Sequence, residues 1–182
     1  TSFDLNITPT GDNTVELNET VVVTVGAQTA GNTYNVGVPS FGTGTITNDD
    51  QAVVSISTES ESEGTSLSYT VSISNPVDVS VSATSNTADG TALAASDYTA
   101  ISGGTVTFGA NSTGDQTVTV ATGADNLVEL NETLSLILSS LSTSGRDVIF
   151  TGSASTITGG GTITNDDQAV VSISTESESE GT

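Results

Sequence analysis

The chain has 182 residues, with 22 Asp and Glu against a single Lys or Arg, and a formal net charge of −21. It contains no His, Cys or Lys, which excludes His-based triads, thiolate nucleophiles, Schiff-base chemistry and structural zinc sites. One basic side chain, Arg146, cannot form a nucleic-acid surface, and a chain without Trp has little to line a sugar cleft. The composition therefore argues against an enzyme, and it predicts neither a nucleic-acid partner nor a small-molecule substrate. No apolar stretch is long enough to span a membrane.

High net charge with modest hydrophobicity is typical of disorder, but Val, Ile and Leu recur in strict alternation, which indicates half-buried strands. Strands are predicted at 52–56, 67–73, 77–83, 106–108, 118–120 and 134–138, and around Ile163. Gly, Asn, Asp and Ser turn signals separate them, and no helical period competes. These features predict an all-β fold, an immunoglobulin-like antiparallel sandwich of about seven strands.

An internal repeat divides the chain. The 22 residues GTITNDDQAVVSISTESESEGT occur at 44–65 and again, identically, at 161–182, an offset of 117 residues. A second motif, DNTVELNET at 12–20, returns as DNLVELNET at 125–133. A period of this length suits a domain array rather than a solenoid. We therefore expect the latter part of one repeat at 1–50, a complete repeat at 51–167 and the start of a third at 168–182, as in an excerpt from a longer array.

The acidic residues gather at turns and strand ends. If several acidic loops share one end of the sandwich, at least four carboxylates converge there without a cation, and like charges at short range oppose ionisation. Calcium removes this conflict, because it accepts six to eight oxygen ligands from separate loops, whereas magnesium demands a stricter octahedron. Any single acidic pair could instead be a solvated turn. Glu59 and Glu61, which alternate with Ser, are expected to point outward.

Three motifs together resemble the Calx-beta family, whose repeats occur in the calcium-binding domains of sodium/calcium exchangers and in large bacterial surface proteins. They are SDYTAISGGTVTF at 96–108, DNLVELNETLSLIL at 125–138 and GTITNDD at 161–167. The resemblance covers all of 51–167 and the matching parts of 1–50 and 168–182. It implies an immunoglobulin-like sandwich that binds Ca²⁺ in loops at one end.

The resemblance also implies a ligand set. In the complete repeat it comprises Glu63, Asp97, Asp125, Glu129, Asn165, Asp166 and Asp167, with Glu132 as a further acidic position. In the first repeat it comprises Asp12, Glu16, Asp49 and Asp50, and Glu180 would open the site of the third. The chain departs from the strongest calcium binders at Asn165, where they carry a third aspartate, and at Ala124, where they carry another acid. We therefore expect fewer ions, or weaker binding, than in the exchanger domains.

The favoured interpretation is a structural segment of an extracellular bacterial adhesin, fibre or motility-associated surface filament, in which calcium near the repeat junctions stiffens the array. Its partners would be neighbouring repeats and, in a fibre, other copies. One alternative is a regulatory calcium sensor that signals to a partner. Another is a glycan- or protein-binding module that uses the loop end directly, which a glycan screen would reveal.

Overall fold

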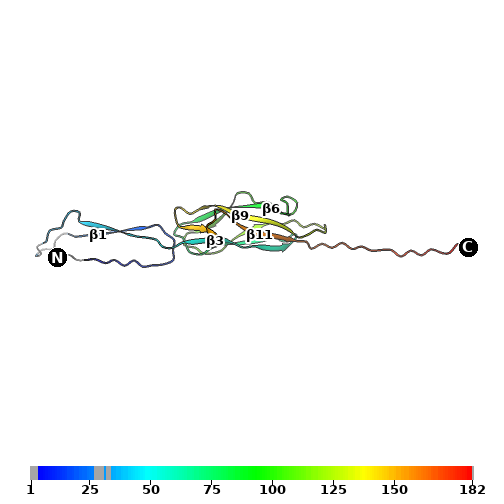
Figure 1. The fold of residues 1–182 in the computed structure, drawn as a ribbon, viewed down its shortest axis with the longest axis horizontal. Coiled ribbons are helices and arrows are strands. Elements are labelled where there is room, and N and C mark those ends of the chain that lie inside the picture. The colour runs from blue at the N-terminus through cyan, green and yellow to red at the C-terminus, as the bar shows by residue number, and fades with distance from the viewer. Residues whose placement is uncertain (1–3, 27–30, 32–33, 182) are drawn as a thin grey trace.

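The computed structural model describes residues 4–26, 31 and 34–181, and two packed sheets form its body (Figure 1). One sheet has the order β10-β3-β5-β8 and the other the order β4-β11-β9-β6-β7. This arrangement confirms the predicted all-β sandwich. The strands of the first sheet are β10 (Val148–Phe150), β3 (Ala52–Ile56), β5 (Leu67–Ile73) and β8 (Gln116–Val120). Those of the second are β4 (Glu59–Ser62), β11 (Ile157–Thr164), β9 (Glu132–Ser142), β6 (Val81–Asp89) and β7 (Gly104–Phe108). A 3-10 turn (Thr151–Ser153) follows β10.

The core lies between the two sheets and follows the period-two pattern of the sequence. Every second residue of β5 is buried, and β9 likewise buries Leu134, Leu136 and Leu138. The ring of Tyr69 crosses the core to β11, where a Cβ on Gly161 would lie 2.1 Å from its hydroxyl oxygen. The glycine run of β11 therefore provides the space that this tyrosine occupies. Burial raises the pKa of Tyr69 to about 12.

The strand predictions differ from the structure in three respects. The body contains nine strands rather than about seven, because two short edge strands, β4 and β10, escaped the pattern analysis. Both pair in parallel, β4 with β11 and β10 with β3, so the sandwich is not wholly antiparallel. The predicted strand 77–83 is wrong at its start, since β6 begins at Val81 and the backbone of Val77 pairs elsewhere.

The first partial repeat contributes a two-stranded hairpin of β1 (Glu19–Thr24) and β2 (Phe41–Ile46), which lies beyond one end of the body (Figure 1). Its register matches that of the complete repeat. Glu19 pairs with Ile46, just as Glu132 pairs with Ile163 in the β9–β11 ladder. The hairpin is therefore the counterpart of β9 and β11, joined to β3 by residues 47–51.

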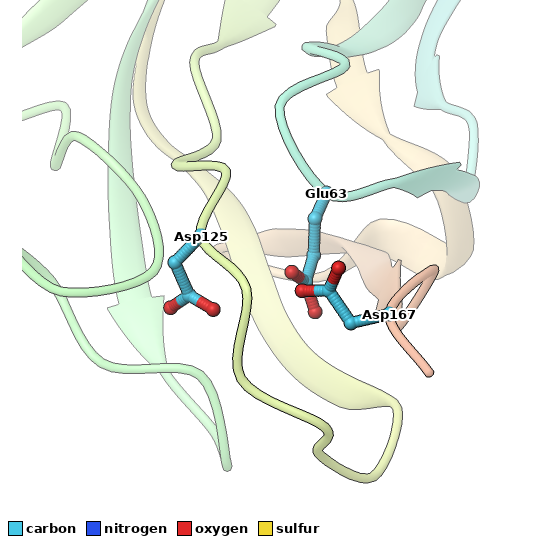
Figure 2. Close-up of side chains that lie close together, drawn as sticks. All are labelled: Glu63, Asp125 and Asp167. Atoms are coloured by element: carbon cyan, nitrogen blue, oxygen red, sulfur yellow. The ribbon is translucent and has the colours of Figure 1, made fainter. Parts of the chain in front are cut away.

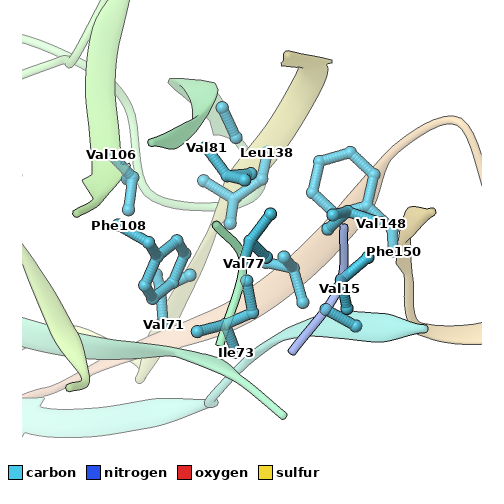
Figure 3. Close-up of a cluster of buried hydrophobic side chains, with 13 residues drawn as sticks. Val15, Val71, Ile73, Val77, Val81, Val106, Phe108, Leu138, Val148 and Phe150 are labelled. Carbon is cyan, nitrogen blue, oxygen red and sulfur yellow. The ribbon is translucent and has the colours of Figure 1, made fainter. Parts of the chain in front are cut away.

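A loop of the first repeat enters the core of the complete repeat. Val15 is 0 % exposed and belongs to the same buried cluster as Val77, Val148 and Phe150 (Figure 3). Its N–H donates to the carbonyl of Pro76 at 2.9 Å, and its carbonyl accepts from the N–H of Asp78 at 3.1 Å. This pairing is why Val77 does not extend β6.

An ion pair borders the docked valine. Arg146 donates to both carboxylate oxygens of Asp78, from Nε at 2.8 Å and from Nη2 at 2.7 Å. Such bidentate pairs fix geometry as well as charge, and this hydrogen bond with Arg146 lowers the pKa of Asp78. The one basic side chain of the protein thus orients the residue whose N–H holds the carbonyl of Val15.

Replacing Val15 with alanine tests whether the repeats are joined by real packing. We expect Val15→Ala to lower the free energy of unfolding by about 2 kcal/mol, because two buried carbons are lost and a cavity remains. Urea unfolding of the whole chain measures this change. Val22→Ala is the matched control, because Val22 is 58 % exposed on β1. Equal stability of the two variants would show that Val15 is not packed in solution.

Candidate metal centre

Three carboxylates meet at the end of the sandwich opposite the hairpin. One oxygen from each of Glu63, Asp125 and Asp167 lies within 4.8 Å of the others (Figure 2). Glu63 follows β4 and Asp167 lies three residues after β11, while Asp125 lies in the connection from β8 to β9. Because β4 and β11 run parallel as neighbours, their chains leave the sheet side by side, and the N–H of Glu63 donates to the carbonyl of Thr164 at 3.1 Å. The parallel edge pair therefore brings residues from opposite ends of the repeat together.

Two acids of the cluster, Glu63 and Asp125, also line a small cavity with a volume of about 50 Å³. Asp97, Glu129 and Glu132 lie around it together with Glu63 and Asp125. Backbone hydrogen bonds fasten the three contributing loops to one another, from Gly64 N–H to the Gly123 carbonyl and from Gly123 N–H to the Asp97 carbonyl, both at 2.8 Å. The carboxylates are thus presented by a connected set of loops rather than by independent turns.

Asn165 has a positioning role in this structure. Its Oδ1 accepts from the N–H of Glu129 at 2.8 Å, and its Nδ2 donates to the carbonyl of Asp167 at 2.9 Å. A carboxylate could not make the second bond, because it has no proton to donate. Asn131 completes the link, since its Oδ1 accepts from the N–H of Asn165 at 3.2 Å. Asn131 was not among the predicted site residues, although Asn recurs at the same position in both NET motifs.

The electrostatics of the cluster are unfavourable without a counter-charge. Burial raises the pKa of Glu63, and the charges of Asp125, Asp167, Asp166 and Glu129 raise it further. Burial also raises the pKa of Glu132, and the charge of Asp97 and a hydrogen bond with Asp97 raise it further.

One carboxylate oxygen of the cluster lacks any partner. Asp167 Oδ2 is buried and accepts no hydrogen bond. The one basic side chain, Arg146, is engaged with Asp78. A buried, unpartnered carboxylate oxygen costs free energy unless a cation binds it, and hard oxygen ligands of this kind suit Ca²⁺. The residues present therefore fit a divalent cation.

The first repeat carries the corresponding half of this arrangement. Asp12, Glu16, Asp49 and Asp50 line one open groove beside β1 and β2. Asn48 repeats the bonds of Asn165: its Oδ1 accepts from the N–H of Glu16 at 3.1 Å, and its Nδ2 donates to the carbonyl of Asp50 at 2.8 Å. Burial and the nearby carboxylates, first among them Glu19, raise the pKa of Glu16. The two identical NDD segments thus adopt the same local structure in both repeats.

Comparison with known proteins identifies the family. A family model of the Calx-beta domain matches residues 1–51 and 48–167. The chain belongs to the Calx-beta family. A search of curated proteins found no match.

Solved structures show the same fold at low sequence identity. The apo-form Calx CBD1 domain is similar with a TM-score of 0.54 and 20 % identity, over 65 % of this chain and 100 % of that one. CBD12 from CALX1.2 gives 0.55 and 19 %, over 63 % of this chain and 46 % of that one. The calcium binding domain CBD12 of CALX1.1 gives 0.53 and 18 %, over 64 % and 48 %. The chain therefore spans about half the length of the CBD12 structures.

The predicted Calx-beta site residues are not all equally close to the cluster. Asp166 is exposed next to it and acts on Glu63 through its charge. Asp97 lines the cavity while one of its oxygens, Oδ2, accepts from the N–H of Leu93 at 2.7 Å. Glu180 is exposed in the extended segment after β11, and this sequence holds only the first 15 residues of its repeat.

The expectation for the acidic pair of β4 is half correct. Glu61 is exposed as predicted, but Glu59 is partly buried and accepts a hydrogen bond from the hydroxyl of Ser57. Both lie on β4 itself, before the end of the strand where Glu63 turns into the cluster. Glu61 therefore provides a natural control for Glu63.

The ion-free chain should lose stability as pH rises above 4.5. The pKa values of Glu63, Glu132 and Glu16 are raised above their ordinary value of 4.5, so between 4.5 and those raised values the folded chain binds more protons than the unfolded chain. The free energy of unfolding therefore falls as pH rises through this window and levels off above it. The lowered pKa values of Asp78 and Asp89 act below 3.8, outside the window.

Urea unfolding in calcium-free buffer, from pH 4.5 to neutral, measures this slope. Glu63→Gln should reduce the slope, with Glu132 and Glu16 still contributing, and Glu61→Gln should leave it unchanged. Stability that rises with pH across the window would contradict the electrostatic account of the cluster.

Proposed function

We propose that this chain is a structural segment of an extracellular bacterial adhesin, fibre or surface filament, and that Ca²⁺ bound at the junctions between its repeats stiffens the array. The observation that carries the proposal is the position of the acidic cluster. Asp167 closes it, and Gln168 and Ala169 already repeat the start of the next domain. An ion held there would tie the loops of one repeat to the chain that leaves for its neighbour.

The first junction supports this interpretation. Asp49 and Asp50 lie in the residues that join β2 to β3, and Asp12 and Glu16 flank the loop that inserts Val15 into the next repeat. The acids and the connection between repeats are therefore parts of one local structure. A cation that bridges these acids would restrict the hinge, which is only five residues long, 47–51.

The choice of calcium rests on the ligands. Glu63, Asp125 and Asp167 offer only carboxylate oxygens, from three separate loops, and the name of the CALX1.1 structure describes that relative as calcium binding. Asn165 and Ala124 supply fewer charges than an all-acid site would. Calcium sites of extracellular modules bind at about 10⁻⁴–10⁻³ M, which is sufficient where calcium is millimolar.

The extracellular setting is proposed on similar grounds. A weak structural calcium site is useful only where calcium is abundant, and a surface of Ser, Thr and acids keeps a long array soluble. Among the described residues, no helix is long and apolar enough to cross a membrane. The neighbouring repeats of the array are its proposed partners.

A regulatory calcium sensor is the second candidate, favoured by the similarity to the calcium binding domain CBD12 of CALX1.1. Affinity separates the two functions. Sensor sites bind calcium at about 10⁻⁷–10⁻⁵ M, because they must respond to small changes in a low concentration, whereas structural sites need no such sensitivity.

Calcium should raise the melting temperature of the chain. For a site with a Kd of about 10⁻⁴ M, calcium at about 1 mM is in roughly tenfold excess, and one ion then contributes about 1.4 kcal/mol. For a chain of this size, that corresponds to a rise of about 3–6 °C. Thermal unfolding in millimolar calcium and in chelator measures the shift, with magnesium as a second cation for comparison.

The variants locate the effect. Glu63→Gln should reduce the calcium-dependent shift by the contribution of its own cluster, and Glu61→Gln, two residues earlier and exposed, should preserve the full shift. If wild-type melting is identical in calcium and chelator, the acidic loops are solvated turns and the calcium part of the proposal is wrong.

A further inference from the structure

The loop that precedes β9 exposes three large apolar side chains. Leu127 is 62 % exposed, Val128 54 % and Leu130 87 %. They lie on either side of Glu129, at the end of the sandwich where Asp125 and Glu63 meet. Exposed large apolar groups in so short a loop indicate an interaction surface rather than a solvated turn.

The same loop occurs a second time in this chain, in a docked state. Residues 12–20 and 125–133 differ at one position only, Thr14 against Leu127. In the first copy, Val15 is 0 % exposed, between the segment around Val77 and strand β10 of the following body. Val128 is its counterpart and has no such neighbour.

The chain leaves the two sites along equivalent paths. Asn48 and Asn165 make the same hydrogen bonds, to the N–H of Glu16 and of Glu129 respectively. Each NDD segment is followed by the sequence QAVVSISTESESEGT, which in the complete repeat forms β3 and β4. The segment after Asp167 is therefore the start of the same body that receives Val15.

We propose that Val128 is the docking residue for the next repeat, and that its occupant is a second copy of the body 51–167. The counterpart of Val77 in that copy pairs with Val128, and the counterparts of Val148 and Phe150 cover its side chain. Each repeat thus carries a docking valine at one end, which we call the plug, and at the other end the apolar site around Val77, Val148 and Phe150, which we call the socket. The contact is therefore head-to-tail and can propagate along the array.

The socket is bordered by Arg146, the single basic side chain of the repeat. The N–H of Asp78 donates to the carbonyl of Val15, and Arg146 holds the Asp78 carboxylate by two hydrogen bonds. A second copy of the body brings its own Arg–Asp pair to Val128. Near that plug, Leu130 takes the place of Leu17, whose side chain approaches Gly145 in the first junction.

This inference rests on the array part of the proposed function but not on the ion, because the plug is apolar. The test therefore uses a chain in which residues 66–167 are repeated once after Thr182, so that the third repeat is complete. The protein has no cysteine, so Thr113→Cys in the original body and in the added copy provides two sites for spin labels. Thr113 is exposed, and both labels lie outside the plug loop.

The distance distribution between the labels reports the second junction. We expect one narrow distribution in the parent chain, and a broad one after Val128→Ser, with loss of hydrogen-exchange protection at the counterpart of the Asp78 N–H. Folding is not at risk, because Val128 is half exposed in this chain. Leu127→Thr is the matched control and should change nothing, since the docked loop carries Thr14 there. Val15→Ser should also leave this distribution unchanged, because it acts on the other junction.

The outcomes separate the two proposals. A narrow distribution that survives Val128→Ser, or a broad one in the parent chain, overturns the docking inference and leaves calcium binding untouched. Suppose that the distribution is narrow in the parent chain and broad after Val128→Ser, and that each has the same width in calcium and in chelator. This result supports the docking and contradicts the stiffening role of the ion.

Discussion

The repulsion among Glu63, Asp125 and Asp167 is the constraint on which the end of this repeat depends. Three carboxylates lie within 4.8 Å of one another, and the one basic side chain of the protein is paired with Asp78. The folded state tolerates this arrangement because β4 runs parallel to β11 and backbone hydrogen bonds connect the loops. The hydrophobic core supplies the free energy, and the loops store part of it as electrostatic strain that a cation can release.

The proposed ion site and the docking valine share a single short loop. Glu16 and Val15 are adjacent in the first repeat, as Glu129 and Val128 are in the second. In the first repeat, Glu16 lines the acidic groove of its own repeat, whereas Val15 enters the core of the next one. Anything that orders this loop, including an ion on its carboxylates, therefore also orders the plug. In the proposed array, this coupling gives a physical reason for the close repetition of the loop, since each junction would draw both functions from the same few residues.

The alternation of apolar residues predicted the sandwich and most of its core, because period-two burial is a local property of each strand. It could not predict β4, whose sequence ESES carries no apolar signal and which forms only because β11 offers it an edge. Nor could it predict that Val77 pairs with Val15, a contact across 62 residues that depends on how two repeats meet.

The candidate site followed a similar division. The resemblance to the Calx-beta family indicated Glu63, Asp125 and Asp167, which the structure brings together. It could not distinguish Asp167, whose Oδ2 is buried without a partner, from its exposed neighbour Asp166. It also treated Asn165 only as a weakened ligand. In the structure, the side-chain amide of Asn165 forms hydrogen bonds with the backbone of both Glu129 and Asp167. This positioning role depends on the folded geometry of the loops, which the motif alone does not reveal.

Calorimetric titration of the chain with calcium tests the central claim most directly. The account predicts binding in the range of about 10⁻⁴–10⁻³ M, the class of extracellular structural sites. It also predicts that Asp167→Asn removes the share of this binding that belongs to the cluster at the end of the complete repeat, and that Asp166→Asn weakens that share only slightly, because only Asp167 belongs to the cluster. Absence of binding, or equal losses in the two variants, would contradict the assignment of the acidic cluster as a calcium site.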